Sequence, residues 1–529
     1  MSQYQISIFN DVLGPVMTGP SSSHTAGPGR IGYFIGKLMD SFEYIKIEFP
    51  QKGSYAGTYK GQKSDVAIVA GLLGMEIIHP KFKDSLAILE EKNISLEIVI
   101  TDYEAEHPNS SIITLKKKSG EQVSVESWST GGGMFVIRSI NGISVTCKGD
   151  YHELVVLGDT SLDPELSVKL EQCLKSWNIV SVHKNICVTK GVSNIKLSTE
   201  PSKSLISTLS NITESCGGKL RYIPPILPVA TGEEKILPFE TADELEKYLF
   251  EHEMPLWQAA VTYEAVRSGW SEKQVLSYAE YLLGVMKKSI QQGLAADFQM
   301  SGFLSPTAYK IEQASNNEQL IDTGVIGKGT IYSTAVMEYN SALGQVVASP
   351  TAGSCGVLPG TIFALIGINQ EDLTEAAKAL MCAGLIGVFI AKQATFAAEV
   401  CGCQAEIGSA SCMAAALVCH FMSIDAKISL KAASMAMQNT LGLICDPVAG
   451  CVEIPCINRN AMAVSNAIVC ANLAVGGFDP VISLDEVILA MYKVGKMLPR
   501  ELRCTGLGGL CDTVKAKELK LIIKKKFAN

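Results

Sequence analysis

The sequence lacks the features that mark secreted, membrane-spanning and nucleic-acid-binding proteins. Its 529 residues are only 19% charged, and the formal net charge of −8 gives no reason to expect a nucleic-acid partner. The stretch Met1–Asp11 has neither the basic start nor the apolar centre of a secretory signal. The most apolar stretch, between Lys378 and Lys392, is shorter than the roughly 20 residues that cross a bilayer, which predicts a buried helix. We therefore expect a cytoplasmic protein without membrane or nucleic-acid partners.

Motifs of several cofactor-binding families are also missing. None of the 16 cysteines forms the C-x₂-C-x₂-C run of electron-carrying ferredoxins. The glycines Gly131–Gly133 do not have the spacing of a dinucleotide-binding loop. Enzymes that use pyridoxal phosphate need a Schiff-base lysine and a glycine-rich phosphate cradle on an α/β fold. The second half of the chain lacks repeated strand–loop–helix units, so we expect no pyridoxal phosphate.

What is present predicts a multidomain α+β protein. A chain of 529 residues that is 47% hydrophobic is too long for one core and has enough apolar residues for two or three. Residues 1–150 mix period-two alternation, at Tyr44–Phe49 and Gln122–Glu126, with a helical stretch at Val66–Leu73, which predicts an α+β domain. From residue 240 to 529 the pattern is helical nearly throughout, which predicts a mostly all-α catalytic domain.

Residues 151–230 have the pattern of a small domain of their own, and 231–239 form a linker. The predicted order βαββαβ is the ferredoxin-like motif, which many regulatory domains share. An ACT-like regulatory domain and a structural spacer explain it equally well. The six elements are predicted at 154–157, 163–177, 179–189, 193–197, 205–215 and 220–223.

Three cysteines have a sequence context that favours metal chemistry. Cys403 follows a glycine, and Cys445 and Cys456 stand at the two ends of a segment with two prolines and a glycine. Dispersed cysteines beside such turns suit an iron–sulfur cluster in a cleft, with one iron left open for substrate. Cys401 and Cys451 compete for the same role. The simpler interpretation is a set of small core residues, because most free cysteines are buried and behave as small apolar side chains.

Polar segments elsewhere supply candidate acid/base and binding groups. The loop Ser21–Thr25 surrounds one of seven histidines, His24, with hydroxyls, although most serine-rich loops are only loops. Lys60 stands next to a glycine, and Arg459 follows Cys456 closely enough to bind a substrate carboxylate with two hydrogen bonds. The turn Ser349–Gly356 can present backbone N–H groups to an anion, or can simply join two helices.

Together, the Ser21–Thr25 loop, the Gly402-Cys403-Gln404 segment and the Cys445–Asn460 block resemble the iron–sulfur-dependent L-serine dehydratases. The resemblance covers nearly the whole chain except about 151–238, with the family's β part placed before its α part in one polypeptide. It implies an L-serine ammonia-lyase, an oxygen-sensitive lyase of L-serine catabolism and gluconeogenesis that makes pyruvate and ammonia. The implied cofactor is a [4Fe-4S] cluster acting as a Lewis acid, and we expect a homodimer.

The resemblance also assigns roles to residues. Cys403, Cys445 and Cys456 match the three cluster ligands, and His24 and Lys60 match catalytic groups. The implied substrate-binding residues are Ser22, Ser23, Thr25, Arg459 and Asn460.

Two departures from the family are visible. Family members often have histidine where this chain has Gln62, so His24 or Lys60 has to act as the base. Some members also end in a cysteine that reaches the cluster, whereas this chain ends Phe527-Ala528-Asn529. Cys504 and Cys511 are the cysteines nearest the end that can replace it.

Two other functions remain open at this stage. A cluster-dependent L-cysteine desulfidase would use the same ligands, and only pocket residues distinguish the two substrates. An iron–sulfur redox sensor would normally need an output module such as a basic nucleic-acid-binding patch, and no such patch is evident.

Overall fold

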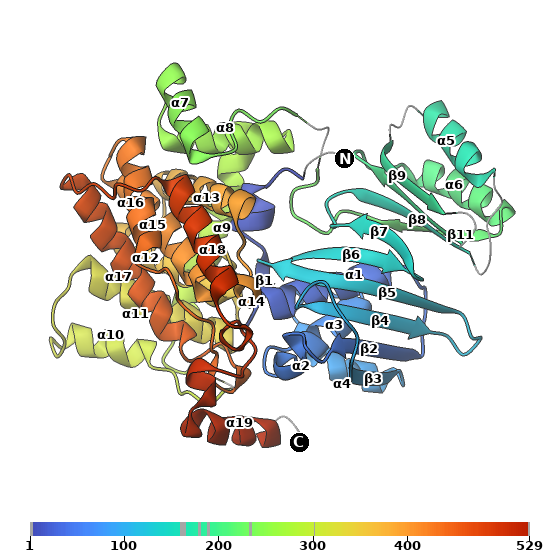
Figure 1. The fold of residues 1–529 in the computed structure, drawn as a ribbon, viewed down its shortest axis with the longest axis horizontal. Coiled ribbons are helices and arrows are strands. Elements are labelled where there is room, and N and C mark those ends of the chain that lie inside the picture. The colour runs from blue at the N-terminus through green and yellow to red at the C-terminus, as the bar shows by residue number, and fades with distance from the viewer. Residues whose placement is uncertain are drawn as a thin grey trace.

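The computed structural model describes residues 4–158, 165–177, 181–187, 191–231, 235–300 and 302–526, with side chains described except for 181–187 and 524–526. Three structural units follow one another along the chain, and Figure 1 shows the two α+β units on one side and the helical unit on the other. The fold is therefore multidomain α+β, as the sequence predicted.

The first unit is a six-stranded sheet with helices packed on one side. Its strand order is β3-β2-β4-β5-β6-β7, and only the β2–β3 pair is parallel. The helices α1 and α3 pack very closely, because the α-carbons of Gly32 and Gly71 lie against the backbone of the other helix. The elements are β2 (Tyr44–Pro50), β3 (Ser95–Thr101), β4 (Ser110–Lys116), β5 (Gln122–Gly131), β6 (Met134–Ile140), β7 (Ile143–Cys147), α1 (Gly27–Gly36), α2 (Tyr55–Thr58), α3 (Ser64–Leu72), η3 (Phe82–Asp84) and α4 (Ser85–Glu91).

The second unit has the element order βαββαβ and an antiparallel sheet ordered β11-β8-β10-β9. It lies next to the first unit, where Arg221 donates to the carbonyl of Leu38 and pairs with Asp40 (Figure 1). The predicted helix start at Asp163 and the predicted strand ends at 179–180 and 188–189 lie outside the described residues. The elements are β8 (His152–Gly158), α5 (Leu166–Ser176), β9 (Ser181–Cys187), β10 (Val192–Leu197), α6 (Lys203–Ser215) and β11 (Gly218–Ile223).

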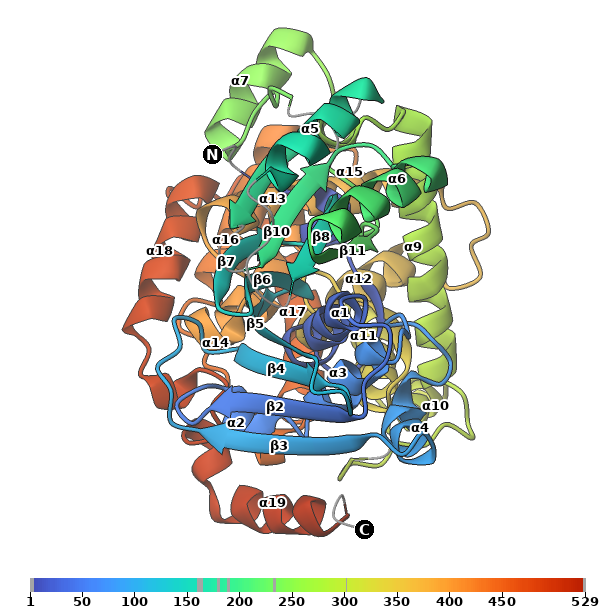
Figure 2. The same cartoon turned by 90° about the vertical axis from the view of Figure 1, so that its right-hand side faces the viewer.

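The third unit is a bundle of helices around a large apolar core. Helices α13 and α15 are almost entirely buried. Helix α18 lies at the edge of the unit (Figure 2). The helices are α7 (Ala242–His252), α8 (Leu256–Ser268), α9 (Glu272–Gly293), α10 (Ala308–Asn316), α11 (Val325–Ser341), α12 (Val357–Ile366), α13 (Thr374–Gln393), α14 (Ala398–Cys401), α15 (Ile407–Phe421), α16 (Ala426–Gln438), α17 (Cys456–Val475), α18 (Leu484–Met497) and α19 (Val514–Lys526).

Helix α13 is longer than the sequence predicted. It has 20 residues and is apolar enough to cross a membrane, but 78% of its most apolar window is buried inside the protein. Ile8, Val12 and Leu13 from the start of the chain pack against its two glycines, Gly384 and Gly387. Burial on all sides explains its composition, as expected of a core helix.

The first residues of the chain belong to the helical unit, which the sequence-based domain boundary at residue 150 did not anticipate. Helix η1 (Ile8–Val12) is buried in the helical core, and β1 (Val16–Thr18) pairs antiparallel with β12 (Gln345–Val347). The amide of Asn10 exchanges two hydrogen bonds with the backbone of Val229. The chain thus starts in the helical unit, leaves it for both sheets, and returns.

Candidate active site

The three predicted cysteine ligands come from three different places in the helical unit. Cys403 begins the short helix η6 (Cys403–Ala405), Cys445 lies in the loop after α16, and Cys456 begins α17. Gly402 has φ +73°, and a side chain there would meet the carbonyl oxygen of Leu443 at 2.7 Å. This close approach places the Cys403 turn directly against the Cys445 loop.

The structure brings these thiols together in a buried cluster. The Cys403 and Cys445 sulfurs and a Glu406 carboxylate oxygen lie within 4.8 Å of one another. Cys403, Cys445 and Cys456 are 3%, 4% and 9% exposed, and none forms a disulfide. Two thiols and one carboxylate therefore converge on one place, and the Cys456 and Cys504 thiols lie near enough to influence them electrostatically.

The turn Ser349–Gly356 lines this cluster, so it does more than join two helices. Thr351 donates to Glu406 Oε1 at 2.6 Å, and Glu406 Oε2 lies 3.9 Å from the Cys403 sulfur. A side chain at Gly353 would meet the Glu406 carboxylate at 2.9 Å. Burial raises the pKa of Glu406 to about 7. This carboxylate is held beside Cys403 by the turn.

The donor set fits a bound metal centre. Contacts with the Cys403 and Cys504 thiols, together with burial, raise the pKa of Cys445, and burial raises the pKa of Cys456. Buried thiols with raised pKa values stay protonated by themselves, whereas a bound metal deprotonates coordinating thiols. Several soft sulfur ligands at one site suit iron–sulfur clusters or zinc. The geometry is thus compatible with a cluster, and it does not by itself identify the metal.

The N-terminal unit contributes a histidine that Ser54 links to the backbone of Cys504. His24 is fully buried in helix η2 (Ser22–Ala26), and its Nδ1 lies 2.9 Å from Ser23 Oγ and 3.2 Å from Glu399 Oε1. Glu399 is in α14, four residues before Cys403. Burial alone would raise the pKa of Glu399, but His24 and Ser23 outweigh it and lower the pKa to about 2. His24 and Glu399 form a buried pair across the domain boundary.

Each ring nitrogen of His24 faces a hydroxyl. Ser54 Oγ lies 3.1 Å from His24 Nε2 and is also within hydrogen-bonding distance of the carbonyl of Cys504, at 3.0 Å. Ser23 Oγ lies 2.9 Å from His24 Nδ1 and donates to Glu399 at 2.6 Å. Both hydroxyls therefore fix the orientation of the imidazole ring.

Other residues of the predicted loop have supporting positions. Thr25 Oγ1 donates to the backbone carbonyl of Gln62 at 2.8 Å, so it joins two loops of the N-terminal unit. Ser22 is buried in η2. Lys60 is exposed, and its side chain has no hydrogen-bond or ion-pair partner among the described residues. The structure therefore does not bring Lys60 into the polar network around His24.

Arg459 and Asn460 both lie on α17 just after Cys456, with different surroundings. Arg459 Nη1 donates to the carbonyl of Ile444 at 2.8 Å and pairs with Asp446 at 3.0 Å. The side-chain amide of Asn460 is fully buried and forms hydrogen bonds with the backbone of Gly353, Gly356 and Cys456. Asn460 thus positions the turn at 353–356 against α17.

Several residues of the site were missed by sequence reasoning. Glu399 and Glu406 flank Cys403 by four and three residues, and their closeness to that cysteine was the only signal available. Ser54 gave no signal, because its role depends on contacts with His24 and with a carbonyl 450 residues further along the chain. Gln62 reaches the Cys504 sulfur, at 3.8 Å.

The competing cysteines point elsewhere. The Cys401 sulfur lies 3.9 Å from the carbonyl of Tyr492, where it fills the space beside Gly495. The Cys451 sulfur lies 3.9 Å from the carbonyl of Ala449, and the Cys511 sulfur lies 3.0 Å from that of Pro447. These contacts favour Cys403, Cys445 and Cys456 over Cys401 and Cys451.

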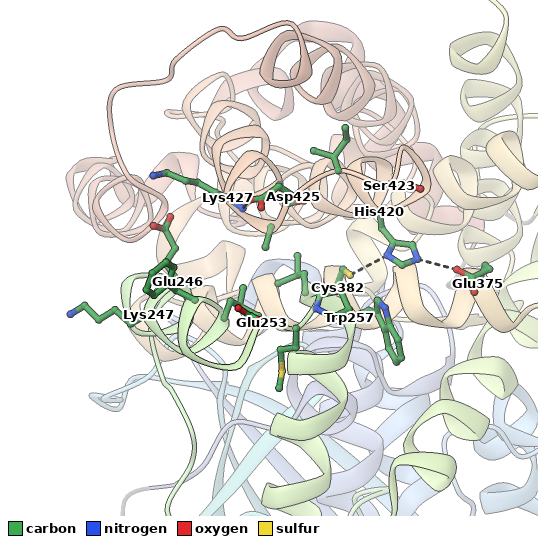
Figure 3. Close-up of a pocket in the computed structure, with 18 residues that line it drawn as sticks. Glu246, Lys247, Glu253, Trp257, Glu375, Cys382, His420, Ser423, Asp425 and Lys427 are labelled. Carbon is green, nitrogen blue, oxygen red and sulfur yellow. Dashed lines mark hydrogen bonds and ion pairs between the residues drawn. The ribbon is translucent and has the colours of Figure 1, made fainter.

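A large open pocket lies in another part of the helical unit. It has a volume of about 900 Å³ and opens between α7, α8, α13 and the α15–α16 connection (Figure 3). His420 lies in it between Cys382, at 3.8 Å, and Glu375, at 3.5 Å (Figure 3). It shares no lining residue with the cysteine cluster, and its volume alone does not make it the active site.

Comparison with known proteins agrees with this arrangement. Residues 11–140 match the family model of the serine dehydratase beta chain, and residues 251–511 match that of the alpha chain. An L-serine dehydratase of Streptomyces coelicolor is 31% identical over 96% of this chain and 99% of its own length. The corresponding values for L-serine dehydratase 2 of Escherichia coli are 26%, 97% and 99%.

A shorter relative matches the helical unit alone. A probable L-serine dehydratase alpha chain of Bacillus subtilis is 35% identical over 53% of this chain and 94% of its own length. The beta-type match contains His24, and the alpha-type match contains Glu399 and the predicted cysteine ligands. The chain therefore belongs to the serine dehydratase family of carbon–nitrogen lyases, with the beta and alpha parts fused in one polypeptide.

Proposed function

We propose that this chain is an L-serine ammonia-lyase that converts L-serine into pyruvate and ammonia. The observation that carries the proposal is the buried pair of His24, from the beta part, with Glu399, from the alpha part, four residues before Cys403 of the Cys403–Glu406–Cys445 group. Relatives named L-serine dehydratase align over nearly the whole chain, which supports serine as the substrate.

Cys403, Cys445 and Cys456 would hold a [4Fe-4S] cluster. With one iron open, such a cluster supplies Lewis acidity that makes the β-hydroxyl of serine a better leaving group. The buried position of these cysteines excludes bulk water from the reacting atoms.

Glu399 is the acceptor that we propose for the substrate ammonium group. Its Oε1 is occupied by Ser23 and His24, but Oε2 is buried and has no hydrogen-bond partner among the described residues. A buried carboxylate oxygen without a donor is costly, so a cationic ligand would be bound favourably there. Arg459 would bind the substrate carboxylate, although it would have to share its guanidinium with Asp446.

His24 is the acid/base group that we propose for the cleft. It would take the proton from Cα and give a proton to the departing hydroxyl, which leaves as water, while Glu399 and Ser23 keep its ring oriented. The resulting enamine tautomerises and is hydrolysed to pyruvate and ammonia. The loop around His24 is kept in place by Ser22, Ser23 and Thr25. Lys60 lies outside the polar network around His24.

We further propose that residues 151–230 are a separate ferredoxin-like domain between a beta-type domain and an alpha-type helical domain. A cavity of about 460 Å³ at its junction with the first sheet supports a regulatory role over a spacer role. We also propose a cytoplasmic homodimer. Met462, Val469 and Leu473 are each at least 40% exposed along one side of α17, which supports a buried contact between copies.

The decisive experiment is an anaerobic assay of the purified protein with L-serine. We expect pyruvate and ammonia in equal amounts, with four irons per chain and loss of both activity and visible colour in air. L-cysteine is the control substrate, since sulfide release faster than serine turnover would favour a desulfidase. Absence of pyruvate from protein with full iron content would overturn the proposal.

A further inference from the structure

We propose that a cavity lined by Arg30 binds a small carboxylate with a flat, apolar body. The cavity has a volume of about 330 Å³ and lies where the three structural units meet. It shares no lining residue with the cysteine cluster or with the His24–Glu399 pair. The inference therefore concerns a second binding site and does not depend on the proposed function.

Each of the three units supplies part of the cavity wall. Arg30 and Tyr33 come from α1, Pro224 and Pro225 from the segment after β11, and Tyr278 from α9. Cavities between domains are common ligand sites, and pockets for small molecules have volumes of about 300–1,000 Å³. This cavity is at the lower end of that range, so its ligand is a small molecule.

Arg30 is a buried cation without a charged partner. It is 3% exposed, and its only hydrogen bond among the described residues runs from Nη1 to the carbonyl of Gly133, at 2.8 Å. A guanidinium group has five N–H donors, so most of its hydrogen-bonding capacity is unused by the described part of the chain. No carboxylate of the described residues forms an ion pair with it.

The charge of Arg30 is poorly solvated where it lies. Burial lowers its pKa to about 10, against smaller opposing effects of Tyr278, Tyr4 and Asp11. The guanidinium is thus still charged at neutral pH, although burying an unpaired charge is unfavourable. A carboxylate can accept two parallel hydrogen bonds from one guanidinium, which replaces the lost hydration.

The remaining wall favours a flat, apolar ligand body. Tyr278 and Tyr281 lie along one side, with ring centroids 5.6 Å apart, and prolines and aliphatic side chains form much of the rest. Aromatic faces of this kind bind other rings by offset stacking or edge contacts. Burial raises the pKa of Tyr278 to about 12, so its hydroxyl stays protonated and can also donate to an anion.

The charge balance favours a single negative charge on the ligand. Glu76 is the other charged residue that lines the cavity, and it is exposed. One guanidinium neutralises one carboxylate, whereas a phosphate dianion would keep a surplus charge and would be repelled by Glu76. The cavity therefore suits a monocarboxylate better than a phosphate ester.

The first test uses wild type alone, with phenylacetate as the probe and isothermal titration calorimetry as the measurement. We expect one phenylacetate per chain, with a Kd of about 1 mM or tighter. Phenylacetamide has the same shape without the charge and should bind about 10- to 100-fold more weakly, because it loses hydrogen bonds between charged groups. Equal affinities, or tighter binding of inorganic phosphate, would overturn the proposal.

The second test locates the probe. Arg30→Met should weaken phenylacetate binding at least about tenfold. Arg138→Met is the matched control, since Arg138 lies over the ring of Trp128 in the same unit and does not line the cavity, and its affinity should equal that of wild type. Tyr281 is 48% exposed, so Tyr281→Ala should fold, and it should weaken binding about 3- to 10-fold. Unchanged affinity in Tyr281→Ala would overturn the assignment even if Arg30→Met did not fold.

Steady-state assays separate this site from the catalytic one. Competitive inhibition of pyruvate formation by phenylacetate, retained in Arg30→Met, would place the probe in the catalytic site and overturn the proposal. Wild type that binds phenylacetate through Arg30 but makes no pyruvate would contradict only the proposed function. Calorimetry and turnover therefore test the two proposals independently.

Discussion

Among the described residues, cysteine, histidine and glutamate gather in two places that differ in nearly every physical respect. Cys382, His420 and Glu375 line an open pocket, with contacts of 3.8 and 3.5 Å and a glutamate whose side chain is 67% exposed. His24 and Glu399 are buried, at 3.2 Å, with side chains 0% and 2% exposed, and Glu399 lies four residues before Cys403.

The comparison shows that pocket volume and chemical composition do not identify the reactive site here. The open pocket has a volume of about 900 Å³, but its histidine and glutamate come from the neighbouring helices α15 and α13, and the glutamate side chain is 67% exposed. The buried site joins Ser23 to Glu399, which are 376 positions apart in the sequence. It leaves Oε2 of Glu399 without a hydrogen-bond donor among the described residues. Burying polar groups costs free energy, so a concentration of buried polar groups is a stronger sign of function than pocket volume.

The largest expected difference between the two places is the effect of removing one cysteine from each. Cys445→Ala should lower pyruvate formation by at least about 100-fold and reduce the iron bound, because it removes a ligand. Cys382→Ala removes a thiol that is equally buried and should leave both unchanged. Iron content and pyruvate formation are measured together, and equal activities in the two variants would contradict the assignment of the site.

Removing one carboxylate from each place should affect stability unequally. Glu399→Ala leaves the buried His24 without its partner and should lower the free energy of unfolding by about 3–5 kcal/mol. Glu375→Ala breaks an exposed pair worth about 0–1 kcal/mol. Urea unfolding of both variants measures this, and Glu399→Gln tests whether charge or shape is responsible. Comparable losses of unfolding free energy in Glu399→Ala and Glu375→Ala would mean that the buried pair stabilises the fold no more than the exposed pair.

Acid should weaken the buried pair in a defined range. The pKa of Glu399 is lowered from 4.5 to about 2, so its ionisation stabilises the folded state fully above about pH 4.5. That stabilisation is lost as the pH falls toward 2. The difference in unfolding free energy between wild type and Glu399→Gln should therefore be smaller at pH 3.5 than at pH 7. A difference independent of pH would show that the carboxylate contributes only by packing.

The smallest effect is expected for His420 in the open pocket. His420→Ala should change the free energy of unfolding by less than about 1 kcal/mol and leave kcat/KM for serine unchanged. Steady-state kinetics checks this against His24→Ala, which should abolish turnover while the cluster spectrum stays intact. A large loss of activity in His420→Ala would give the pocket of Figure 3 a role in turnover.

The sequence predicted those parts of the fold that depend on local pattern. The alternation at Tyr44–Phe49 corresponds to β2, and the apolar spacing at Leu205–Ser215 corresponds to α6. It could not predict that Ile8 and Leu13 pack on α13, because a short apolar segment does not specify which distant core it joins.

The same limit applied to the site. Cys403, Cys445 and Cys456 have distinctive neighbours in the sequence, and the structure does bring them together with Glu406 and Cys504. Ser54 and Glu399 acquire their roles only from contacts across the domain boundary. Asn460 was predicted to bind substrate, but its backbone partners became visible only in three dimensions.

The strand pair β1–β12 ties the N-terminal unit to the helical unit next to the loops of the site. With the segment before β1 also buried in the helical core, the two halves cannot swing apart without breaking that core. Opening the boundary between His24 and the cysteines would therefore also separate apolar side chains of the helical core.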